Sequence, residues 1–244
     1  MNVSIDQFIF KHFINIYSNL QTFDWYYLLL TFPYTLFGPM IPLLAISYVA
    51  KCIPIIYLIM TIMNNRTVKR FDYSRKIAAG LLASVIGDVY ILNMEEVSRS
   101  YLIYGIISFA LAHIFYISAF SFRNYRYHHF FIVIIIFSLS YVMTHERLYG
   151  MNFMERIAIP TYSFIILTMA CCAFLYKDFI SIWNRIPATR MAAISFVISD
   201  SILGLTEITG MIGPHIIPKY VSHVLILSTY YFAQYCFTRS ALFL

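Results

Sequence analysis

The sequence predicts an all-α membrane protein, built as one polytopic bundle of transmembrane helices. Of its 244 residues, 61% are hydrophobic and only 11% are charged, whereas a soluble domain carries about 25% charged residues. Long apolar runs follow one another along most of the chain, and most are near the length that a helix needs to cross a bilayer. This composition argues against a soluble enzyme, a disordered tail and a nucleic-acid-binding protein.

The net charge of +6 comes from few residues, 17 Lys and Arg against 11 Asp and Glu. In a chain this apolar, an excess of basic residues predicts cytoplasmic loops rather than a nucleic-acid-binding face. The cysteines lie in or beside apolar runs and show no CxxC or Cys/His spacing, so neither a disulfide framework nor a structural zinc site is predicted. They are Cys52, Cys171, Cys172 and Cys236.

Residues 1–24 form an N-terminal leader that does not resemble a signal peptide. It has no basic region ahead of its apolar stretch and no small-residue cleavage site. Aromatic side chains interleave with Lys11, His12 and Asn15, which predicts either an interfacial amphipathic helix or a frayed apolar segment. The transmembrane domain is expected to cover residues 25–244.

We expect eight transmembrane helices, because each needs about 20 mostly apolar residues. The predicted spans are 25–48, 49–63, 75–94, 101–120, 128–143, 157–176, 190–208 and 219–239. The second is the weakest, since it is short, contains Pro54 and begins at Lys51. If it merges with the first, seven helices remain. Most Lys and Arg residues fall on one side of these spans, which with eight helices places both termini in the cytoplasm.

The third and seventh predicted helices resemble each other. Residues 79–88 and 191–200 are both rich in small side chains, and both end in a small residue followed by Asp. Small residues let membrane helices approach closely. The two helices are four crossings apart and are expected to run in the same direction, which fits a parallel internal repeat.

Three ionisable residues fall near the middle of predicted spans, where such groups are costly and often functional. They are Asp88, Asp200 and His113. A helix rises about 1.5 Å per residue, so the three lie at a similar depth. We expect them to meet in one polar pocket. Alternatively, either Asp is a hydrogen-bonded structural hub, and His113 is a packing histidine.

Further polar residues are expected to support this pocket. Ser84 and Tyr116 lie one helical turn from Asp88 and His113 and so share their faces. The other candidates are Lys51, Ser199, Tyr230, Tyr231 and Gln234. The last three could instead be core residues, and Lys51 either extends to the membrane interface or binds a phosphate. We place Glu95, Glu96, Glu207 and His215 in loops or at helix ends.

Two buried carboxyl groups that face one pocket cannot easily both ionise, so one stays neutral beside an anionic partner. This pairing suits acid-catalysed cleavage through an oxocarbenium-like cation, as glycosidases use, and it suits proton transfer in a transporter equally well. The sequence contains no GxSxG and no HExxH motif. Its histidines also lack the spacing of a three-His zinc site, so we expect no metal and no organic cofactor.

Several segments together resemble the lysoplasmalogenase, or YhhN-like, family of membrane proteins. The resemblance covers about residues 50–238. It is carried by a Lys-x-x-Pro element, a small-residue helix that ends in Gly-Asp, a helix with His and Tyr three apart, a helix with Ser-Asp, and a last helix with Tyr and Ala-Gln. These segments are residues 51–54, 80–93, 105–120, 191–203 and 229–234.

The resemblance implies hydrolysis of the vinyl ether bond of lysoplasmalogens to a fatty aldehyde and glycerophosphocholine or glycerophosphoethanolamine. Asp88 and Asp200 would be the acid and the stabiliser or base, in either order, and His113 would orient water or relay a proton. Other residues would contact the lipid's glycerol and phosphate. These are Tyr116, Tyr230 and Gln234 for the glycerol, and Lys51 for the phosphate. The implied location is the endoplasmic reticulum, or the inner membrane of a bacterium.

Two alternatives remain open. A small transporter or receptor-like bundle would use the Asp pair as a proton or cation site. An enzyme acting on another lysolipid, such as a lysophospholipase, would need a strong nucleophile for an ester, and none is evident in the sequence. In each case the expected partners are membrane lipids rather than nucleic acid.

Overall fold

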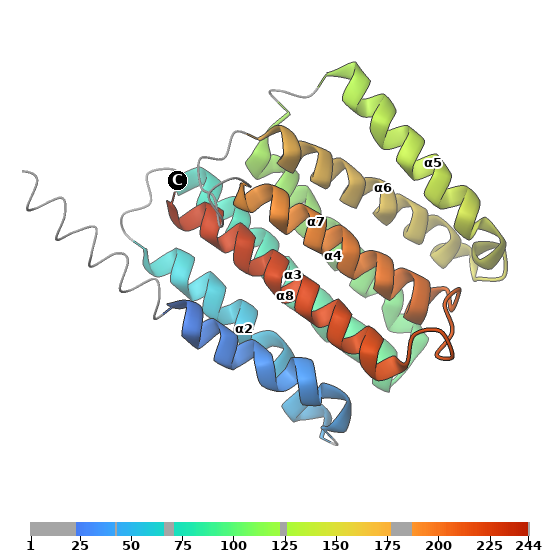
Figure 1. Cartoon of the computed structure of the whole chain (residues 1–244), viewed down its shortest axis with the longest axis horizontal. Coiled ribbons are helices and arrows are strands. Elements are labelled where there is room, and N and C mark those ends of the chain that lie inside the picture. The colour runs from blue at the N-terminus through green and yellow to red at the C-terminus, as the bar shows by residue number, and fades with distance from the viewer. Residues whose placement is uncertain (1–22, 42, 66–70, 123–125, 177–186, 244) are drawn as a thin grey trace, which may run out of the picture.

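The structure, a computed structural model, describes residues 23–41, 43–65, 71–122, 126–176 and 187–243. In these ranges the chain is almost entirely helical, and the helices lie side by side in one bundle (Figure 1). The first described helix covers residues 23–37. The elements that follow are η1 (Gly38–Met40), α2 (Leu44–Asn64), α3 (Phe71–Glu96), η2 (Arg99–Tyr101), α4 (Leu102–Phe120), α5 (Tyr127–Tyr149), α6 (Phe153–Leu175), α7 (Ala188–Leu203), the π-helical η3 (Gly204–Ile208) and α8 (Lys219–Phe243).

The prediction of a polytopic all-α membrane bundle is confirmed. Six of the described helical segments are long and apolar enough to cross a bilayer. They are Leu44–Asn64, Asp72–Glu96, Arg99–Phe120, Tyr127–Tyr149, Phe153–Leu175 and Ala188–Ile208. The first and last predicted spans also form helices, but residues 23–37 are fewer than the roughly 20 that a span needs, and α8 mixes Tyr, Ser, Thr and Gln with its apolar residues. The predicted leader lies almost entirely outside the described residues.

The predicted boundary between the first two spans is wrong. The first helix ends at Phe37, η1 follows with Pro39 in its first turn, and α2 begins at Leu44. A proline lacks an N–H group and disfavours helical backbone in the residue before it, so the chain breaks near Pro39 rather than at residue 48. The two helices therefore do not merge. Pro54 lies inside α2, and Lys51 is in the middle of this helix instead of at its start.

Two antiparallel helix pairs form the centre of the bundle. The pair α3 and α4 packs against the pair α7 and α8 through α3 with α8, and α6 contacts both α4 and α7. In Figure 1, α2 and the helix of residues 23–37 cover one side, whereas α5 lies at the opposite edge beside α6. The helices α3 and α7 run in the same direction (Figure 1), as the predicted parallel repeat requires.

Glycines bring α3 and α4 into close contact. A Cβ atom built on Gly87 would lie 2.7 Å from the Phe109 ring, and one on Gly105 would lie 2.8 Å from Ile91. A Cβ on Gly80 would overlap the Tyr116 ring. This ring is fully buried, and its centroid lies 4.5 Å from the centroid of the Phe237 ring. The side chains of Asp88 and His113, on these two helices, are therefore held at fixed positions.

We expect Gly80→Ala to destabilise the protein, because the buried Tyr116 ring has no space into which it can move. Overpacking of this kind costs about 1–3 kcal/mol, so the thermal unfolding temperature in detergent should fall clearly. Gly150→Ala is the control, since its Cβ would meet only the Arg147 carbonyl oxygen at an ordinary 3.6 Å. Equal unfolding temperatures for the two variants would contradict the tight α3–α4 contact.

Candidate active site

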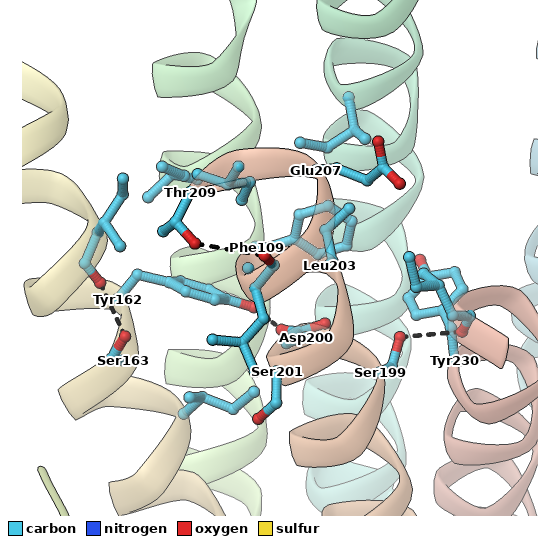
Figure 2. Close-up of a pocket in the computed structure, with 18 of the residues that line it drawn as sticks. Phe109, Tyr162, Ser163, Ser199, Asp200, Ser201, Leu203, Glu207, Thr209 and Tyr230 are labelled. Atoms are coloured by element: carbon cyan, nitrogen blue, oxygen red, sulfur yellow. Dashed lines mark hydrogen bonds between the residues drawn. The ribbon is translucent and has the colours of Figure 1, made fainter. Parts of the chain in front are cut away.

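A cavity of about 820 Å³ lies within the bundle and is lined by residues of α2 through α8. Asp88 of α3 and Asp200 of α7 both line it. Tyr162 of α6 and Tyr230 of α8 line it as well, and Figure 2 shows these two tyrosines with Asp200. The two carboxyl groups that the sequence analysis singled out thus face the same space. Lys51 also lines this cavity.

Asp88 lies in a buried cluster that joins three helices. Its side chain is almost completely enclosed, the Tyr230 hydroxyl donates to Oδ2 at 2.7 Å, and Lys51 Nζ lies 3.8 Å from Oδ1. Lys51 is itself 5% exposed, so it does not extend to the membrane interface. The Tyr231 hydroxyl donates to the Lys51 main-chain oxygen at 2.9 Å, which fastens α2 to α8 beside the ion pair.

Asp200 has a different set of neighbours. The Tyr162 hydroxyl donates to its Oδ2 atom, and His113 Nε2 lies 2.9 Å from the Tyr162 oxygen. The same nitrogen is 3.7 Å from Asp200 Oδ2, which is too far for a hydrogen bond. His113 is fully buried and lies behind Tyr162 rather than in the cavity lining. The three ionisable residues do come together, but only the two aspartates face the cavity.

The predicted binding residues divide into two groups. Lys51, Ser199 and Tyr230 line the cavity. Behind them lie residues with little or no exposed surface; these are Ser84, Tyr116, Tyr231 and Gln234. The Tyr116 hydroxyl donates to Gln234 Oε1 at 2.9 Å, so these two side chains bond to each other within the core. Core packing was the alternative that the sequence left open for Gln234.

Tyr162 was not predicted as a site residue from the sequence. It is one of 21 tyrosines in an apolar chain, and nothing in its local sequence separates it from residues that pack against lipid. Its position on α6, opposite both α4 and α7, becomes visible only when the three helices are assembled. Only the tertiary arrangement of the helices therefore identifies Tyr162 as a site residue.

Charged residues gather at the end of the cavity formed by the α3–α4 and α7–α8 connections. Glu95, Glu96 and Glu207 lie at helix ends as expected, yet they line the cavity, together with Arg99 and Lys219. The Glu207 carboxylate accepts a hydrogen bond from Ser222 at 2.9 Å. The cavity thus has a charged mouth above a carboxylate pair, and that mouth was not predicted.

Arg99 connects three elements at this mouth. Its guanidinium donates to the buried Glu155 carboxylate at 3.0 Å and to the Ile208 carbonyl oxygen at 3.1 Å. The start of α4 is thereby tied to the first turn of α6 and to the end of η3. A π-helical segment such as η3 often occurs at a functional site, and here it carries Glu207 into the cavity wall.

The fold and the site define a polytopic membrane protein with two carboxyl groups facing one internal cavity. Residues 46–241 match the model of the YhhN family, so the chain belongs to that family. It is similar to lysoplasmalogenase TMEM86A of Bos taurus, with 26% identity over 201 residues that cover 80% of this chain and 78% of the relative. The human protein of the same name is 25% identical over 200 residues, with the same shares covered. No solved structure matches the chain significantly.

The buried ion pair between Lys51 and Asp88 predicts that the loss of one partner destabilises the protein more than the loss of both. Lys51→Met should lower the thermal unfolding temperature strongly, because removing one partner of a buried pair costs about 3–5 kcal/mol. Adding Asp88→Asn to this variant should restore part of the loss, since the uncompensated charge is then removed.

The control is Lys76→Met, which removes an exposed ion pair with Asp72 at 2.7 Å on the surface of α3. Surface pairs contribute about 0–1 kcal/mol, so this variant should unfold close to the parent temperature. If Lys51→Met and Lys76→Met unfold alike, Lys51 and Asp88 do not interact as described.

Proposed function

We propose that this protein is a lysoplasmalogenase, which hydrolyses the vinyl ether bond of a single-chain alkenyl glycerophospholipid. The observation that carries the proposal is the pair of carboxyl groups, Asp88 and Asp200, that line one cavity. Its support is the membership of the YhhN family and the similarity to two proteins named lysoplasmalogenase. The products are a fatty aldehyde and glycerophosphocholine or glycerophosphoethanolamine.

The first chemical step needs a neutral carboxyl group. Its proton is transferred to the vinyl carbon β to the ether oxygen, so that a C–H bond forms and an oxocarbenium ion remains. The second carboxylate stabilises this cation, much as a glycosidase carboxylate does. Two acids that face one cavity favour this division of roles, because two like charges in a poorly solvated space disfavour double ionisation.

Water completes the reaction. It adds to the oxocarbenium carbon and passes one proton to a carboxylate, which regenerates the acid form. The resulting hemiacetal collapses to the aldehyde and releases the glycerol hydroxyl of the polar product. One water molecule is consumed, and the side chains return to their starting state.

The cavity has separate polar and apolar parts that suit a lysolipid. Apolar side chains of α5 and α6 form one wall, and they include Ile136, Leu139, Ile159, Ile166 and Leu167. An alkenyl tail placed there would bring its vinyl ether to the carboxyl pair. Lys51 beside Asp88 and the basic groups at the mouth, Arg99 and Lys219, would contact the phosphate. In this arrangement Tyr116 and Gln234 support the wall from behind.

The proposed topology places both termini in the cytoplasm and the mouth of the cavity on the opposite side. The α3–α4 and α7–α8 connections, which carry the mouth residues, belong to the side with fewer basic residues. In a eukaryotic cell we propose the endoplasmic reticulum as the location, so the polar product would be released on the lumenal side.

A transporter that uses the Asp pair as a proton or cation site is the second candidate. The common direction of α3 and α7 (Figure 1) is the feature that favours it, since parallel repeats recur in transporters. The two candidate functions differ in the conditions under which activity can be measured. An enzyme turns over in detergent, whereas a transporter shows activity only between two compartments.

We expect the purified protein to release fatty aldehyde from a lysoplasmalogen in mild detergent. Asp88→Asn and Asp200→Asn should each lower kcat by about 10²-fold or more, because the amide can neither donate an acidic proton nor carry the charge. The measurement is aldehyde formation, with unfolding temperatures recorded in parallel.

The control variant is Asp72→Asn, which alters an exposed carboxylate on the same helix as Asp88 and should retain full activity. A saturated ether analogue should yield no aldehyde. Release of aldehyde that is unaffected by both Asn variants would remove the carboxylate pair from the mechanism. An inactive but well-folded protein would favour the transporter.

A further inference from the structure

Tyr162 occupies the space between His113 and Asp200. Its hydroxyl donates to Asp200 Oδ2 and lies 2.9 Å from His113 Nε2. The three residues come from α6, α4 and α7, so this chain of hydrogen bonds crosses the bundle. In Figure 2, the Tyr162 ring extends from α6 toward Asp200. Tyr162 also lines the cavity, whereas His113 does not.

Among the described residues, the Tyr162 hydroxyl is the hydrogen-bond partner of the His113 ring. His113 is fully buried, and its Nδ1 atom finds no hydrogen-bond partner in the described part of the chain. One face of its ring meets Phe196, whose centroid is 4.9 Å away in an edge-on arrangement. The distance of 3.7 Å from Nε2 to Asp200 exceeds a hydrogen bond. Any hydrogen-bonded influence of His113 on Asp200 therefore passes through the Tyr162 hydroxyl.

The unpartnered nitrogen fixes the direction of the hydrogen bonds. A buried N–H group without an acceptor is rarer than an acceptor without a donor, so Nδ1 is the bare nitrogen and Nε2 carries the hydrogen. His113 then donates to the Tyr162 oxygen, and Tyr162 donates to Asp200. This hydrogen bond orients the Asp200 side chain. It also holds Oδ2, which leaves Oδ1 as the oxygen available to a substrate.

We propose that Tyr162 is a positioning residue, which orients the Asp200 carboxyl group for reaction and transmits the effect of His113 to it. The inference rests on the proposed vinyl ether hydrolysis. It replaces a direct role for His113 at the substrate with an indirect one. Tyr230 holds Asp88 from α8 in the same manner, but no hydrogen bond connects Tyr230 to His113 among the described residues. Tyr230 is therefore a matched control.

The test is a double-mutant cycle on aldehyde release from a lysoplasmalogen. Tyr162→Phe removes only the hydroxyl and should lower kcat by about 10- to 100-fold, as misplaced catalytic groups do, while KM changes less than about threefold. His113→Leu should lower kcat to a similar extent. The double variant should be no slower than Tyr162→Phe alone, because both changes break the same connection.

The matched cycle uses Tyr230→Phe with His113→Leu. Here the two reductions in kcat should multiply, because these residues act on different carboxyl groups. His113→Gln gives a second readout, since its side-chain amide can donate to Tyr162 and should keep more activity than His113→Leu. If His113→Leu does not fold, His113→Phe takes its place in both cycles, because it keeps an aromatic ring against Phe196 and cannot donate to Tyr162.

Three outcomes would overturn the inference. Multiplicative effects of Tyr162→Phe and His113→Leu would show that His113 reaches Asp200 directly. A rise in KM with unchanged kcat in Tyr162→Phe would make Tyr162 a substrate-binding residue. Full activity of Tyr162→Phe would remove its role. An active parent protein with any of these results leaves the proposed function standing, whereas a folded but inactive parent refutes the function and this inference together.

Discussion

The arrangement of the site depends on the burial of Asp88, because neighbouring polar groups must offset the free-energy cost of burying its carboxyl group. An isolated carboxylate inside a bundle of this kind is strongly unfavourable, and the chain meets this cost with Lys51 from α2 and Tyr230 from α8. Both partners are side chains of other helices, so the compensation also fixes how α2, α3 and α8 sit against one another. The hydrogen bond from Tyr231 to the Lys51 carbonyl oxygen strengthens the same junction. The same contacts therefore hold the site residues in place and join the helices.

The two carboxyl groups are held in parallel ways with one difference. Each accepts a hydrogen bond from a tyrosine on a neighbouring helix, and each has a basic group a little farther away. For Asp88 that group is the lysine Lys51, and for Asp200 it is the histidine His113. The similar segments 79–88 of α3 and 191–200 of α7 thus place equivalent aspartates beside different basic groups. Such inequality is what an acid paired with a stabilising anion requires.

Helices and the two aspartates were within reach of sequence reasoning, because an apolar run and a charge inside it are both local features. The position of Asp88, Asp200 and His113 along their helices was sufficient to predict that the three residues lie close together. Rotation about the helix axis was not known, so His113 and Gln234 could not be placed behind the cavity wall. The break at Pro39 was missed because apolar residues continue across it. Tyr162 and the charged mouth depend on which helices are neighbours, and no local pattern carries that information.

The exposed helix α5 gives the cavity an unusual boundary. Only Val133 and Leu148 of α5 are buried, yet Ile136, Leu139 and Met143 of the same helix line the cavity. This wall consequently has protein on one side and, in a membrane, acyl chains on the other. Among the described elements α5 packs mainly against α6, so the surrounding lipid contacts much of its remaining surface. A different detergent or bilayer thickness therefore changes the molecules that pack against one wall of the cavity.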